Sequence, residues 1–147
     1  MDKILIFKTS TDVTLNKLFH ELGEKNIDCL VQRSQMERYR KLYPYIHFID
    51  ICQEGFYDLP FKVIEMISNQ IYDEVYITFS GREGYNYGNV LELLEQMNYK
   101  SAFFYNCDGD RMEILGGNRI KDTLCRIYIG FICFIYDIKE KVSGCVV

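Results

Sequence analysis

Residues 73–97 read DEVYITFSGREGYNYGNVLELLEQM, and this stretch decides the predicted fold. It begins with β-branched and aromatic residues over 75–79, which predict a strand. A polar loop with three glycines follows over Gly81–Gly88. Apolar residues at helical spacing then predict a helix, and Asn89 and Glu92 are spaced to form its capping box. A strand, a glycine loop and a helix N-terminus form the part of an α/β protein where anions and sugars usually bind.

The same alternation of strand and helix extends along the rest of the chain. Further strands are predicted at 3–8, 27–32, 45–51 and 101–106, with a short added strand at 112–115. Helices are predicted between them. The first has its core face at Leu15, Leu18, Phe19 and Leu22, the second starts at a capping box over 34–37, and the third runs from Pro60 to Ile71. Such alternation predicts a parallel sheet with helices on both faces.

The predicted fold is therefore α/β: one three-layer αβα Rossmann-like domain over residues 1–117, with a mostly parallel sheet of about five strands. The first strand, KILIFK at 3–8, is nearly all apolar, which is typical of the middle of a sheet. This favours the order 3-2-1-4-5, with the flavodoxin-like order 2-1-3-4-5 as the alternative. In the first order, the loops at 9–12 and 81–89 face each other across one crevice.

Composition limits the possible functions. The chain has 147 residues, of which 48% are hydrophobic and 26% charged, and its net charge is −4. The negative charge argues against nucleic acid as a partner. No pair among the six cysteines has CxxC spacing, and most lie within apolar patterns, which predicts buried thiols in a reducing cytoplasm. Neither the cysteines nor His20 and His47 have the spacing of a metal site, so no metal or cofactor is predicted. Both histidines are interpreted as structural or surface residues.

Residues 118–142 predict a helix that is apolar nearly all round, and residues 143–147 a loose tail. The uncharged run of this helix spans only residues 127–136, which is short for a membrane span. Three interpretations stay open: a last helix packed on the sheet, a docking helix for a partner protein, or a peripheral membrane contact through Arg119, Lys121 and Arg126.

The loop after the fourth strand is the best candidate for a ligand site. Gly81 and Gly84 let the backbone approach a ligand, and Arg82 can pair with a phosphate or carboxylate. Tyr85 can stack on a sugar or base, while Asn86 and Asn89 can hydrogen-bond hydroxyl groups. The alternative is a long surface turn, although loops of this length are often functional.

The loops after the first and fifth strands supply the remaining candidates. Thr9, Ser10 and Thr11 can hold an anion at a helix start, and Asp12 can act as a general base; simple helix capping is the alternative. Asn106 and Asp108 end the fifth strand and are expected to line the same crevice, with a tight turn as the alternative.

Three stretches, KILIFKTS, YDEVYITFSGREGYNYGNV and AFFYNCDGD, together resemble the N-terminal Rossmann-like domain of GT-B glycosyltransferases. The heptosyltransferase-like and surface-polysaccharide enzymes are the most similar type, and the resemblance covers roughly residues 1–115. It implies an acceptor-binding domain whose loops after strands 1 and 4 face the cleft, with a sugar or lipid-linked sugar as acceptor. A GT-B enzyme needs a second, donor-binding domain, for which this chain has no room.

The resemblance therefore implies a fragment, a degenerate relative, or one subunit of a split glycosyltransferase in cell-surface polysaccharide synthesis. A donor-binding subunit would then dock on the C-terminal helix, in the cytoplasm or at the inner face of the membrane. The competing interpretation is a non-catalytic α/β module that binds a ligand or a protein. A small nucleotide-binding enzyme is a third, and the lack of a phosphate loop such as GxGxxG or GK[ST] weighs against it.

Overall fold

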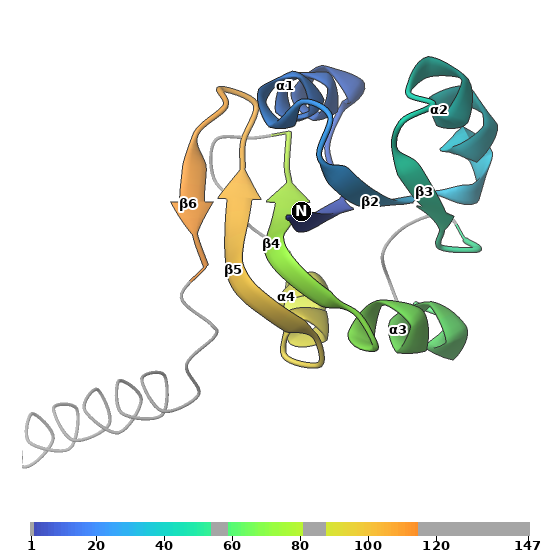
Figure 1. Ribbon diagram of the computed structural model, residues 1–147, viewed down its shortest axis with the longest axis vertical. Coiled ribbons are helices and arrows are strands. Elements are labelled where there is room, and N and C mark those ends of the chain that lie inside the picture. The colour runs from blue at the N-terminus through green and yellow to red at the C-terminus, as the bar shows by residue number, and fades with distance from the viewer. Residues whose placement is uncertain (1, 54–58, 81–87, 115–147) are drawn as a thin grey trace, which may run out of the picture. The chain divides into compact units, whose positions relative to one another are not determined.

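The computed structural model describes residues 2–53, 59–80 and 88–114, which form one sheet between two layers of helices (Figure 1). The strands are β1 (Lys3–Phe7), β2 (Asn26–Val31), β3 (His47–Asp50), β4 (Ile71–Thr78), β5 (Asn98–Tyr105) and β6 (Arg111–Glu113). The helices are α1 (Asp12–Leu22), α2 (Met36–Leu42), α3 (Phe61–Ser68) and α4 (Gly88–Leu94), with a 3-10 turn at Arg33–Gln35. The segments 118–142 and 143–147 lie outside the described residues.

The order of the strands in the sheet is β3-β2-β1-β4-β5-β6. The predicted order of the first five strands is confirmed, and the flavodoxin-like alternative is wrong. β1 lies in the middle because its side chains are apolar on both faces; Ile4, Leu5, Ile6 and Phe7 are all fully buried. It pairs in parallel with β2 on one side and β4 on the other, so that Ile6 lies between Cys29 and Tyr76.

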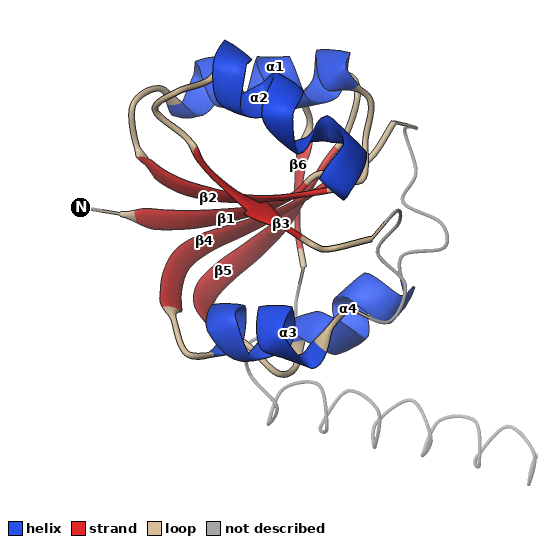
Figure 2. Ribbon diagram, turned by 90° about the vertical axis from the view of Figure 1, so that its right-hand side faces the viewer, coloured by secondary structure: helices blue, strands red, loops and turns tan. Residues whose placement is uncertain are grey.

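Helices cover both faces of the sheet, as predicted. Figure 2 shows α1 and α2 on one face and α3 and α4 on the other. The predicted core face of α1 is confirmed, because its four apolar residues are buried against the first sheet face. On the second face, Val63 and Ile67 of α3 and Val90 and Leu93 of α4 pack over β1 and β4. Each face therefore has its own hydrophobic core.

The sheet has one strand more than the five predicted for the parallel core. β6 pairs antiparallel with β5, with Phe104 opposite Met112, and all three of its residues are exposed. An added strand was expected at 112–115, and it lies at Arg111–Glu113. The four pairings among β1 to β5 are parallel, so the sheet is mostly parallel, as predicted.

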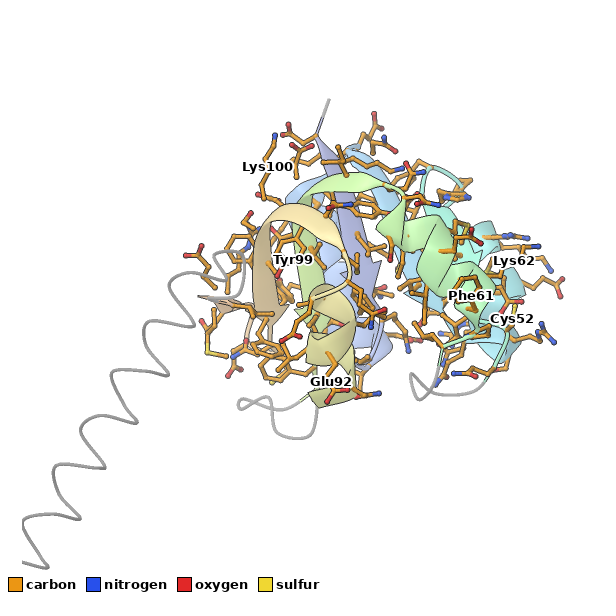
Figure 3. All side chains as sticks on the ribbon, turned by 90° about the horizontal axis from the view of Figure 1, so that it is seen from below. Cys52, Phe61, Lys62, Glu92, Tyr99 and Lys100 are labelled. Atoms are coloured by element: carbon orange, nitrogen blue, oxygen red, sulfur yellow. The ribbon has the colours of Figure 1, made fainter. Side chains whose placement is uncertain are left out.

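Both predicted capping boxes are wrong, because the helices begin at other residues. Ser34 lies within the 3-10 turn, and α2 begins at Met36 with no side-chain bond from the capping residue. α4 begins at Gly88, so Asn89 is its second residue rather than its cap. Glu92 is exposed on α4 (Figure 3).

The third helix ends earlier than its apolar pattern predicts. Ile71 follows Ile67 at helical spacing and was expected on the buried face of that helix. The structure ends α3 at Ser68 and places Ile71 at the start of β4, opposite Asn98 and 70% exposed. The spacing of four residues between Ile67 and Ile71 fits a helix, but Ile67 belongs to the last turn of α3 whereas Ile71 is the first residue of β4.

Candidate functional site

The loops after β1 and β4 meet at the carboxyl edge of the sheet, which is the edge where the parallel strands end. The Thr9 hydroxyl donates to the Thr78 carbonyl oxygen, and Ser10 Oγ donates to Thr78 Oγ1 at 2.8 Å. The Thr11 amide donates to Ser80 Oγ at 3.0 Å. Residues 9–11 therefore contact the end of β4 and Ser80. The predicted crevice between residues 9–12 and 81–89 falls mostly outside the described residues and stays a prediction.

Burial divides these hydroxyl groups into two kinds. Thr78 and Ser10 are buried, and Thr78 Oγ1 also donates to the Phe7 carbonyl oxygen at 2.9 Å, so this pair ties β4 to β1. Thr11 and Ser80 are exposed. Thr11 and Ser80 therefore face solvent, with the Thr11 hydroxyl also 3.4 Å from Thr14 Oγ1, while the buried pair fixes the backbone beneath them.

Asp12, the first residue of α1, binds three side chains. Its Oδ1 accepts a hydrogen bond from the Tyr39 hydroxyl and lies 3.5 Å from Lys8 Nζ, while its Oδ2 lies 2.6 Å from an Arg38 guanidinium nitrogen. The Tyr39 hydrogen bond lowers the pKa of Asp12, and the two cations add to this effect against the opposing effect of burial. A carboxylate stabilised in this way is a weak base, so its geometry suits an ion pair better than proton abstraction.

Lys8 also belongs to this group, although the sequence predicts no role for its side chain. It follows β1 directly, and its backbone N–H donates a hydrogen bond to the Leu30 carbonyl oxygen, which continues the β1–β2 pairing by one residue. Lys8 is only 8% exposed. Its ammonium lies 5.6 Å from the centre of the Tyr39 ring, which stacks on Phe48. Burial, together with the hydrogen bond to Asp12, raises the pKa of Tyr39, which therefore stays a neutral donor. The feature of the sequence that could have indicated a role for Lys8 is its position, as a lysine directly after the apolar run of residues 4–7.

Asn106 and Asp108 form the turn between β5 and β6. Asn106 is buried, its Oδ1 accepts a bond from the Asp110 amide at 2.8 Å, and its Nδ2 donates to Asp110 Oδ2 at 3.1 Å. The carbonyl oxygen of Asp108 accepts a bond from the Lys17 ammonium. These contacts give Asn106 a structural role in the turn, which was the alternative interpretation.

Of the other predicted site residues, only Asn89 is among the residues that the structure describes. Asn89 lies in the first turn of α4. Gly81, Arg82, Gly84, Tyr85 and Asn86 lie outside the described residues, and their ligand-binding role stays a prediction.

A second polar group lies at the opposite, amino edge of the sheet. The buried carboxylate of Asp28 lies 3.2 Å from Lys3 Nζ and 2.7 Å from His47 Nδ1, and it accepts a bond from Tyr72 at 3.0 Å. His47 is 68% exposed and faces Asp28 in the β2–β3 register. The structural interpretation of His47 agrees with this pairing, since it links two neighbouring strands. His20 lies exposed in the last turn of α1.

The cysteines only partly follow the prediction. Cys29 is buried in β2, which raises the pKa of its thiol. Cys52 is exposed, so the expectation of a buried thiol is wrong there, whereas the exposed Cys107 lies in the turn after β5, in agreement with its predicted loop position. Within the described ranges, no three His, Cys, Asp or Glu side chains gather as a metal site would require. The same ranges contain no helix with the length and apolarity to cross a bilayer.

Comparison with known proteins adds no relative. No protein-family model matches the chain, and neither a curated protein nor a solved structure matches it significantly. What is established is the class: an α/β domain with a Rossmann-like strand order and a polar group at its carboxyl edge. Function is therefore inferred from the side chains of that edge.

Proposed function

We propose that the chain binds a sugar or a similar polyhydroxyl ligand at the carboxyl edge of β1 and β4. The observation that supports this is the hydrogen bond from the Thr11 amide to Ser80 Oγ, which places two exposed hydroxyl-bearing residues side by side, next to Asp12 and its partner Arg38. The strand order reverses between β1 and β4, and open α/β sheets bind their ligands at this point. Hydroxyl, carboxylate and guanidinium groups can all hydrogen-bond sugar hydroxyls.

The finer proposal is that the bound sugar is the acceptor of a glycosyltransferase-like assembly in cell-surface polysaccharide synthesis. It rests on the resemblance to the acceptor domain of GT-B enzymes. In this proposal the sugar can be lipid-linked, and a donor-binding subunit completes the enzyme at the inner face of the membrane, with the 118–142 segment as the docking or membrane contact.

A second candidate is a module that binds its ligand without chemistry. The observation that favours it is the state of Asp12, whose carboxylate binds Tyr39, Arg38 and Lys8 and is a weak base. The two candidates share the same binding site. They differ in whether glycosyl transfer occurs once a donor subunit is supplied.

Saturation-transfer NMR of the full chain tests the binding proposal. Glucose, N-acetylglucosamine and UDP-glucose are the probes, and Thr11→Ala and Ser80→Ala are the variants. We expect the two sugars to give transfer signals, and each variant to weaken binding by about three- to tenfold, the effect of one lost hydrogen bond. Ser68→Ala is the matched control, since Ser68 ends α3 just before β4 begins, at the amino edge of the sheet.

The outcomes separate the candidates. Sugar binding that weakens in Thr11→Ala and Ser80→Ala but not in Ser68→Ala supports the site. Binding of UDP-glucose alone, through its nucleotide, would instead indicate a donor-binding enzyme. A chain that gives no transfer signal with any probe would overturn the proposal and leave a protein-interaction module as the better explanation.

A further inference from the structure

Positive charge exceeds negative charge at the carboxyl edge beside α1. Lys8 and Arg38 both pair with the single carboxylate of Asp12, so the three groups together carry one net positive charge. The chain as a whole carries −4. The third contact of Asp12, the Tyr39 hydroxyl, is neutral. The net charge of this group is therefore positive, although the net charge of the whole chain is negative.

The ammonium of Lys8 is buried without a full set of partners. It is 8% exposed and has three N–H donors. Among the described residues it has one carboxylate oxygen at 3.5 Å, at the outer limit of a hydrogen bond, and the face of the Tyr39 ring. Removing an ammonium group from water is costly unless it is fully paired. An additional anion close to Lys8 would supply the missing acceptors.

Two further features of the same place favour an anion. The first backbone bond within α1 runs from the Leu15 amide to the Thr11 carbonyl oxygen, so the amides of residues 12–14 lie at the open, positive end of an 11-residue helix. Arg38 is 63% exposed and its planar guanidinium has five donors, of which Asp12 uses only part. Arginine binds phosphate in a fork with two parallel hydrogen bonds.

We propose that Lys8, Arg38 and the first turn of α1 bind a phosphate group carried by the sugar. This inference rests on the proposed function and specifies its ligand: a phosphorylated sugar rather than a neutral one. Lys8 supplies a desolvated charge that strengthens the attraction, and Arg38 reaches the phosphate from the solvent side. Asp12 holds both cations in place before the ligand arrives. A soluble sugar phosphate and a lipid-linked sugar carry the same group.

Isothermal titration calorimetry of the full chain tests the proposal with four probes: glucose, glucose 1-phosphate, inorganic phosphate and dodecyl glucosyl phosphate, a diester that represents a lipid-linked sugar. We expect glucose 1-phosphate or the diester to bind at least tenfold more tightly than glucose. Tighter binding of glucose 1-phosphate would indicate a soluble sugar phosphate as the ligand, and tighter binding of the diester would indicate a lipid-linked sugar. Lys8→Met and Arg38→Gln should each reduce the advantage over glucose, the ratio of the two affinities, by about three- to tenfold. Arg38 also lies beside the proposed sugar site, so Arg38→Gln is expected to weaken glucose as well, but less than the phosphorylated probes.

Arg40→Gln is the matched control, because Arg40 is an exposed arginine on the same helix and its loss changes the net charge equally. Equal affinity for glucose and both phosphorylated probes would overturn the phosphate inference while the sugar proposal stands. Equal losses in Arg40→Gln and Arg38→Gln would overturn it too, since the effect would then be one of net charge. If inorganic phosphate binds as tightly as the sugar phosphates, the anion-binding site is supported, but the proposal that the protein recognises the sugar part of the ligand is overturned. Failure of all four probes would overturn both.

Discussion

The Tyr105 hydroxyl donates a hydrogen bond of 2.7 Å to Glu21 Oε1, which joins β5 to the last turns of α1 across 84 residues of sequence. The other oxygen of the same carboxylate accepts a bond of 3.1 Å from Arg111 in β6. Arg111 also donates to the Tyr76 hydroxyl at 3.1 Å. One glutamate thus connects a helix to two neighbouring strands of the sheet.

Replacing Glu21 with Ala should lower the free energy of unfolding by about 1–3 kcal/mol, because the buried Tyr105 loses its hydrogen-bond acceptor. Glu21→Gln keeps an oxygen that can accept this bond, so its loss should be smaller. Urea unfolding followed by circular dichroism measures both. If the two variants lose the same stability, the charge on Glu21 matters and the Tyr105 hydrogen bond does not.

Acid should destabilise the protein partly through Asp12. The Tyr39 hydrogen bond and the neighbouring cations lower the pKa of Asp12 in the folded state below its ordinary value of 3.8. The unfolded chain therefore binds the proton first, and the stabilisation is complete above 3.8 and is lost as the pH falls further, through the folded-state pKa.

The measurement is the free energy of unfolding as a function of pH, for the wild type and Asp12→Asn. We expect the variant to be less stable at neutral pH and to lose less stability on acidification. Glu21 keeps its own acid dependence in both proteins: burial acts to raise its pKa, but the hydrogen bonds from Tyr105 and Arg111 lower it overall. Parallel curves for the two proteins would show that the contacts of Asp12 do not contribute.

Ser68→Ala should stabilise the fold slightly or leave it unchanged. Within the described residues, the buried Ser68 hydroxyl has no hydrogen-bond partner, and alanine is the better helix former at the end of α3. A gain of up to about 1 kcal/mol is expected in thermal or urea unfolding. Ser101→Ala is the comparison, because Ser101 Oγ donates to the Asp73 carbonyl oxygen at 3.3 Å and its removal should cost stability.

Gly109→Ala should destabilise the β5–β6 turn. Gly109 has a φ of +88°, where an L side chain costs about 1–2 kcal/mol, and an added Cβ would lie 2.6 Å from the end of the Lys17 side chain. Lys17 can move, but it then loses its bond to Asp108. The same substitution in a Lys17→Ala background should therefore cost about 0.5 kcal/mol less. A cost that is identical in both backgrounds would assign the whole effect to the backbone.

The strand order could be predicted because one local property decides it. A strand that is apolar on both faces, such as residues 4–7, has to lie in the middle, and the alternation with helices fixes the parallel pairing. The helix boundaries were harder to predict, since a residue such as Ile71 fits the helical period while belonging to the following strand. Local spacing does not show where one element gives way to the next.

The candidate site could be predicted only in part. The polar loop at 9–12 was visible because it follows the central strand directly. Its partners Arg38 and Tyr39 come from α2, some 27 residues further on, and reach Asp12 only because α2 packs beside α1. No spacing in the sequence encodes that packing. Lys8 likewise reads as the polar end of a strand until the structure shows it buried beneath Tyr39.

The central position of β1 also affects synthesis on the ribosome. β1 and β2 can pair once residue 31 has emerged, but the other side of β1 pairs with β4, which ends at Thr78. At about 5–20 residues per second, those 47 intervening residues take roughly 2–10 s to appear. During that time the most apolar strand of the protein has an open backbone edge, which makes the nascent chain a natural client for a chaperone at the ribosome exit.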